Sequence, residues 1–225
     1  MRYTRLIVPT VNLTRGAPHV FRSAHLPEGV DDLDVSISDL LIAATAAPTY
    51  FPHKEIKEQA FADGGLWATD PSLLAYAEAM RIRSECRRGN CDPKFPPESI
   101  HLLSVGTGIS QYSLTPPGGD AGVMYWVKHV ADVMGSAQTQ GIHQPLRFIM
   151  GNNYTHLNFQ MEERWALDEV GNIPKLFALG KKRAKEEFPM LNGCFFQHQR
   201  TQFEPYVPGS EESMAVPRQY NPENT

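Results

Sequence analysis

Asp63, followed by Gly64 and Gly65, is the part of this 225-residue sequence best suited to chemistry. A carboxylate that a turn holds rigidly at the end of a strand can act as a general base. The two glycines carry no side chains, so they leave room for a nucleophile and a substrate to approach. Asp-Gly is also an ordinary tight-turn sequence, because glycine accepts positive φ without penalty. By themselves, these residues predict either a catalytic base or a structural turn.

Other residue types give weaker signals for a reactive site. The eight histidines form no His-x-x-x-His pair, so their spacing predicts no zinc site, and we expect no metal or other cofactor. Gly106-Thr107-Gly108 lacks the Gly-Lys-Ser ending of a phosphate-binding loop and predicts a strand-end turn instead. A Ser-His-Asp triad stays open, because its members meet only in space. His53 is the histidine to inspect for it, and Ser104 is an alternative nucleophile that lacks a glycine-flanked elbow.

The elements that must position these residues alternate between strand and helix patterns. Strands are expected over about 3–13, from 19, and over about 58–62, 100–105 and 155–160, and helices over about 36–47, 71–88, 122–140 and 174–187. The first helix can be capped by Asp34 or Ser36. Asp70 is a suitable N-cap for the second helix, which is expected to expose Glu78 and to bury Ile82.

Strands that alternate with helices predict an α/β fold, a three-layer sandwich with a mainly parallel central sheet. Ligands of such folds bind at the carboxyl ends of the strands. Asp63 and the turn at Gly106 each follow a predicted strand, so we expect both at that edge of the sheet.

The composition is that of a globular protein, with 41% apolar and 20% charged residues. A net charge of −4 gives no general attraction to nucleic acid, and none is expected as a partner. Three cysteines suit a reducing compartment, so a cytoplasmic location is expected. The longest apolar run, 40–51, is shorter than the roughly 20 residues that a membrane span needs.

Three blocks of the sequence resemble the patatin-like phospholipase family. They are the alanine-rich segment 43–52, Asp63-Gly64-Gly65, and the segment 102–108 that ends in Gly106-Thr107-Gly108. The resemblance implies a lipid acyl hydrolase that cleaves phospholipids or related esters, as a phospholipase A does, with a Ser-Asp dyad. Asp63 would be the base of this dyad, and Gly64 and Gly65 its motif turn.

The family's serine lies in a Gly-x-Ser-x-Gly elbow nearer the N-terminus, and no such elbow occurs in residues 1–225. The resemblance therefore implies that residues 1–200 are the C-terminal portion of the domain, without the nucleophile and inactive alone. Residues 201–225 are expected to be a poorly ordered polar tail. A non-catalytic scaffold or regulatory binding module remains the alternative. Basic clusters at 81–88 and 181–185 predict solvated faces, with contact to phospholipid headgroups at the membrane surface left open.

Overall fold

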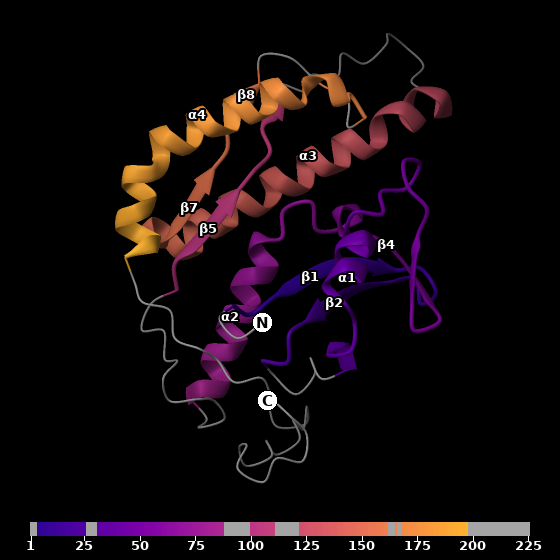
Figure 1. The fold of residues 1–225 in the computed structure, drawn as a ribbon, viewed down its shortest axis with the longest axis horizontal. Helices are drawn as coiled ribbons and strands as arrows, with labels where there is room; N and C mark the ends of the chain where they lie inside the picture. The colour runs from indigo at the N-terminus through magenta and orange to yellow at the C-terminus, as the bar shows by residue number, and fades with distance from the viewer. Residues whose placement is uncertain are drawn as a thin grey trace.

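The computed structural model describes residues 4–25, 31–87, 100–110, 122–161, 165 and 168–197. The expected tail, 201–225, lies outside these residues, so its prediction stays untested. Helices and strands are mixed along the described chain (Figure 1), which confirms the α/β class. No helix in the described part of the chain has the length and apolar character needed to cross a bilayer.

The N-terminal sheet has four strands in the order β2-β1-β4-β3, and all its neighbours are antiparallel. The strands are β1 (Ile7–Asn12), β2 (Ala17–Arg22), β3 (Lys54–Ile56) and β4 (Gln59–Asp63). Only a short turn joins β1 to β2, and such a connection permits antiparallel neighbours alone. Lys57 and Glu58 join β3 to β4 at φ of 49° and 60°, as in a type I′ turn. The expected mainly parallel central sheet is therefore not confirmed here.

One face of this sheet packs against α1 (Ile37–Ala44). The Ser36 hydroxyl accepts a hydrogen bond from the Asp39 amide at 3.1 Å, which confirms Ser36 as the N-cap. The core between helix and sheet consists of buried apolar side chains, Val8, Phe21, Leu40, Ala43 and Phe61.

Helix α2 (Ser72–Arg87) begins as expected, with Asp70 Oδ1 accepting a hydrogen bond from the Ser72 amide at 2.8 Å. Ile82 is buried, as predicted. The exposure predicted for Glu78 is wrong, because this residue is only 6% exposed. Its carboxylate lies 3.1 Å from Arg22 Nε and 3.0 Å from His25 Nε2, so an arginine at the end of β2 and a histidine beyond it compensate its burial.

The C-terminal half contains two parallel strand pairs (Figure 1). β5 (Leu102–Val105) pairs with β7 (Tyr154–Leu157), and β6 (Ile109–Ser110) pairs with β8 (Gln160–Met161). The chain reaches β7 through α3 (Val123–Met150), which is longer than expected and continues past Pro145. Helix α4 (Ile173–Leu191) follows β8. Four short helical turns complete the described elements: η2 (Gly64–Leu66), η3 (Gly151–Asn153), η4 (Val170–Asn172) and η5 (Asn192–Phe196).

Candidate functional site

Asp63 is the last residue of β4, as the sequence predicted for a strand-end carboxylate. Its amide donates to Ala46 O at 3.1 Å, and its backbone stands opposite Thr10 of β1. Its Oδ1 accepts a hydrogen bond from the Gly65 amide at 2.7 Å, which caps η2. No residue of the described ranges forms an ion pair with this carboxylate. Asp63 is therefore held by the backbone while its charge is not neutralised by a described neighbour.

The two glycines after Asp63 serve close packing. Neither adopts positive φ, so the ordinary tight-turn explanation for them does not apply. Gly64 is buried, and a Cβ placed there would stand 2.2 Å from Pro9 O. A Cβ at Gly65 would stand 3.1 Å from Asp63 Oδ1. Gly64 therefore permits close packing on Pro9, and Gly65 keeps a side chain away from the Asp63 carboxylate.

A short hydrogen-bonded path links this turn to α3. The Thr69 hydroxyl donates to Gly65 O at 2.9 Å and lies 3.1 Å from Gln138 Oε1. The Gln138 amide also reaches Leu66 O at 3.4 Å. Thr69 thus belongs both to the surroundings of the Asp63 turn and to the wall of a cavity beyond it.

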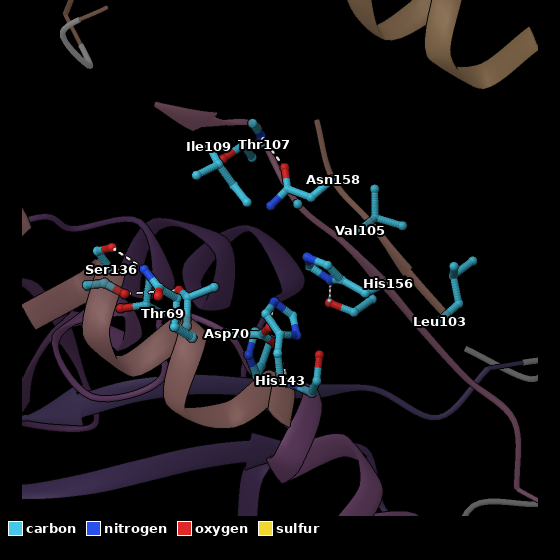
Figure 2. A pocket seen from close by; sticks show the side chains of 18 of the residues that line it. Thr69, Asp70, Leu103, Val105, Thr107, Ile109, Ser136, His143, His156 and Asn158 are labelled. Atoms are coloured by element: carbon cyan, nitrogen blue, oxygen red, sulfur yellow. Dashed lines mark hydrogen bonds and ion pairs between the residues drawn. The ribbon is translucent and has the colours of Figure 1, made fainter. Parts of the chain in front are cut away.

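This cavity has a volume of about 510 Å³ and lies between the start of α2, β5, α3 and β7 (Figure 2). The whole Gly106-Thr107-Gly108 segment lines it, and Asp63 does not. Asp63 ends a strand of the antiparallel sheet, whereas Gly106 follows a strand of a parallel pair. The expectation that both sit on one sheet edge is therefore wrong, because their strands belong to different sheets.

Gly106 and Gly108 shape the connection between β5 and β6. Asn158 Oδ1 accepts hydrogen bonds from the amides of Gly108, at 2.9 Å, and Phe159, at 3.0 Å. A Cβ at Gly106 would stand 2.2 Å from Asn158 Nδ2, and Gly108 has a φ of +107°. These contacts explain the two glycines as a bend in a strand, in agreement with the structural turn that we predicted.

Three side chains from distant parts of the sequence meet at one end of this cavity (Figure 2): Asp70, His143 and His156. Asp70 precedes α2, His143 lies on α3 and His156 on β7. His143 Nε2 lies 3.4 Å from Asp70 Oδ2, and the two imidazole centroids are 3.6 Å apart.

Hydroxyl groups contact the far side of both rings. His143 Nδ1 is hydrogen-bonded to the Tyr154 hydroxyl, and His156 Nδ1 lies 3.1 Å from Ser104 Oγ. Burial lowers the pKa of His156, and the neighbouring His143 lowers it further. Burial and the Asp70 carboxylate raise the pKa of Tyr154. Both shifts favour the neutral forms of these groups.

Sequence reasoning missed this cluster. Asp70 was expected only as a helix cap, and no spacing rule connects residues 70, 143 and 156. Ser104 proves to be paired with a histidine, although not with His53. His53 is half exposed and lies near Glu55, with 3.9 Å between His53 Nε2 and Glu55 Oε1.

Comparison with known proteins finds phospholipases and patatin-like proteins. The chain is 38% identical over 114 residues to a cGAMP-activated phospholipase of Vibrio cholerae, covering 50% of this chain and 31% of the relative. A cGAMP-activated phospholipase of Pseudomonas aeruginosa is 30% identical over 175 residues, 76% of this chain and 48% of the relative. Patatin-like protein 4 of Arabidopsis thaliana is 32% identical over 118 residues, 48% of this chain and 28% of the relative.

No family model matches the chain. The chain spans less than half the length of each of these three relatives. Their shared similarity nevertheless covers about half to three quarters of the chain itself. The comparisons thus confirm the family that the sequence motifs indicated: the chain belongs to the patatin-like phospholipase family.

Proposed function

We propose that this chain carries the base of a patatin-like lipid acyl hydrolase, with Asp63 as the base of a Ser-Asp dyad. The similarity to phospholipases supports the reaction class, which is hydrolysis of an acyl ester in a phospholipid or related lipid. The observation that carries the assignment to Asp63 is its environment. It is a backbone-anchored carboxylate beside two glycines, with no ion pair to any described residue.

The proposed mechanism uses the two carboxylate oxygens differently. The Gly65 amide engages Oδ1, which leaves Oδ2 to accept the proton of a serine hydroxyl. A free aspartate, with a pKa of about 3.9, is a weak base. Close alignment with the hydroxyl lets the proton move as the serine oxygen attacks the ester carbonyl. The absence of a side chain at Gly65, where a Cβ would stand 3.1 Å from Asp63 Oδ1, leaves space for this approach.

We further propose that residues 1–200 are the C-terminal portion of a three-layer patatin-like domain, whose preceding portion supplies the serine elbow. Large apolar side chains on several elements are at least half exposed, as expected of surfaces that another part of a domain covers. They include Leu41 and Ile42 on α1, Val105 on β5, Phe148 on α3, and Phe177 and Phe188 on α4.

The membrane surface is the proposed location of the substrate. Lys181, Lys182, Arg183 and Lys185 are exposed on α4, on the same helix as Phe177. Cationic and apolar side chains on one helix suit contact with headgroups and acyl chains. Within the described part of the chain, Arg183 alone of these four cations is ion-paired, with Glu186 at 3.0 Å.

Hydrolysis of phospholipid vesicles by the full-length protein tests the assignment of Asp63. We expect Asp63→Asn to lower kcat by about 10²–10⁴-fold, the usual contribution of a general base. Glu55→Gln, at an exposed position of β3, should keep the wild-type rate. Full activity of a folded Asp63→Asn protein would rule out the base role. A wild-type protein that stays inactive when cGAMP is present would favour a non-catalytic scaffold or regulatory module instead.

The 225-residue chain alone supplies a second test. It should neither hydrolyse phospholipid nor react with a fluorophosphonate probe, because the proposed nucleophile lies elsewhere. Covalent labelling of Ser104, which lies 3.1 Å from His156 Nδ1, would contradict the dyad and favour a serine-histidine site.

Regulation by cGAMP is part of the proposal, because the Vibrio and Pseudomonas relatives are both named as cGAMP-activated. We expect cGAMP to raise the rate of vesicle hydrolysis by the full-length protein. An unchanged rate at saturating nucleotide would remove this part of the proposal and leave the role of Asp63 standing.

A further inference from the structure

We infer that Asp70, His143 and His156 form a binding site for a divalent transition-metal ion of the zinc type, open to the adjoining cavity. Among the described residues, they are the one group of three or more potential ligands whose donor atoms converge. Two imidazoles and one carboxylate are a ligand set that zinc accepts in proteins. This inference does not depend on the role proposed for Asp63.

The ligand atoms have separations that suit a metal ion. Four ligands about 2.1 Å from a zinc ion stand about 3.4 Å apart at the corners of a tetrahedron. His143 Nε2 already lies 3.4 Å from Asp70 Oδ2. One ligand atom from each of the three residues lies within 4.8 Å of the others, so small side-chain rotations would complete the contact.

The free atoms in the cluster are the ones that a metal needs. The Nε2 atoms of His143 and His156 are both buried and have no hydrogen-bond partner among the described residues, and the one close polar neighbour of His143 Nε2 is Asp70 Oδ2, a proposed ligand, at 3.4 Å. An unsatisfied buried polar atom costs about 1–3 kcal/mol, so two together call for a physical explanation. A cation that accepts the lone pairs of both nitrogens supplies one.

The remaining polar atoms already have the contacts that a second coordination shell provides. The Tyr154 hydroxyl is hydrogen-bonded to His143 Nδ1, and the Ser104 hydroxyl contacts His156 Nδ1. Asp70 Oδ1 accepts the Ser72 amide, which leaves Oδ2 toward His143. Hydrogen bonds of this kind orient metal-binding imidazoles and carboxylates in known sites.

Three protein ligands leave at least one coordination position for water or a small ligand. All three residues line the 510 Å³ cavity, so that position can exchange with its contents. The ion would also link the start of α2, α3 and β7 through their side chains. No spacing motif in the sequence predicts this site, because its ligands come from three separate parts of the fold.

Titration of the metal-free 225-residue chain with Co²⁺ tests the inference directly. We expect one Co²⁺ per chain, with the intense visible absorption of four- or five-coordinate cobalt and displacement by Zn²⁺. Zn²⁺ should also raise the melting temperature, because an ion that binds only the folded state stabilises it. Absence of stoichiometric binding would overturn the inference.

Variants assign the site to these residues. The double variant His143→Gln/His156→Gln should lose the cobalt absorption, whereas His53→Gln, at an exposed histidine, should keep it. Ser104→Ala removes no ligand and should weaken binding by about 10–100-fold by releasing His156 Nδ1. This third variant tests the site even where the double variant does not fold. Wild-type affinity in either Ser104→Ala or a folded double variant would overturn the assignment.

Discussion

Glycine is required at position 64 because two backbone segments approach each other closely there. The chain passes so close to Pro9 that the space for a Cβ is taken by the Pro9 carbonyl oxygen, 2.2 Å away. From the sequence, one explanation for the glycines after Asp63 was the backbone freedom that a tight turn needs. The structure instead explains Gly64 by close packing between β1 and η2, two segments more than 50 residues apart in the sequence.

Gly64→Ala should therefore lower the free energy of unfolding by about 1–3 kcal/mol, the usual cost of overpacking. Urea unfolding followed by circular dichroism measures the change. Gly180→Ala is the matched control, because Gly180 lies in α4 with nothing within 4 Å of its Cβ position. In a helix, alanine is more stable than glycine by up to about 1 kcal/mol. Equal effects of the two substitutions would contradict the packing explanation.

At the scale of elements, local signals located most helices and strands. Ser36 and Asp70 cap the starts of their helices as predicted, since a cap depends on residues only two or three positions apart. Strand β3 was not predicted, because Lys57 and Glu58 form its turn in place of the Asn-Gly or Asp-Gly that is typical of two-residue hairpin turns. The solvent face expected for α2 was wrong at Glu78, because partners beyond the helix decide which of its residues are covered.

The buried carboxylate of Glu78 gives α2 a pH-dependent attachment to β2. Burial opposes its ionisation, but hydrogen bonding to His25 and the charge of Arg22 prevail and hold the pKa of Glu78 below its ordinary value. A pKa lower in the folded than in the unfolded protein means that the folded protein binds fewer protons. The stabilisation is therefore complete above the unfolded pKa, about 4.3, and is lost as pH falls through the folded pKa.

We expect Glu78→Gln to lower the free energy of unfolding by about 3 kcal/mol at pH 7, since it leaves Arg22 and the buried His25 without their anion. The difference from wild type should shrink as pH falls below about 4.3. Urea unfolding at several pH values measures it. Glu55→Gln, whose carboxylate is 79% exposed, should change little at any pH. A difference for Glu78→Gln that does not vary with pH would contradict the role of its charge.

At the scale of the whole molecule, many apolar side chains remain uncovered. Two residues of α3 show the contrast within one turn of helix: Leu146 is fully buried and Phe148 is 94% exposed. Exposed apolar surface of this extent promotes association. The isolated chain should therefore self-associate.

Phe148→Ser should reduce self-association of the 225-residue chain without lowering its free energy of unfolding. Leu146→Ser should instead destabilise it by about 2–5 kcal/mol, because it empties a buried leucine site. Sedimentation velocity and urea unfolding distinguish the two effects. Unchanged association in Phe148→Ser would mean that this part of α3 is not an associating surface.

The family and most secondary structure followed from the sequence itself, because caps, hydrophobic periods and the Asp63-Gly64-Gly65 block are contiguous patterns that short-range chemistry determines. Strand directions, the burial of Glu78 and the meeting of Asp70, His143 and His156 were decided only by tertiary structure. Each depends on which distant segments pack together, since side chains 73 and 13 positions apart along the chain acquire a common chemistry only when α2, α3 and β7 bring them to one cavity.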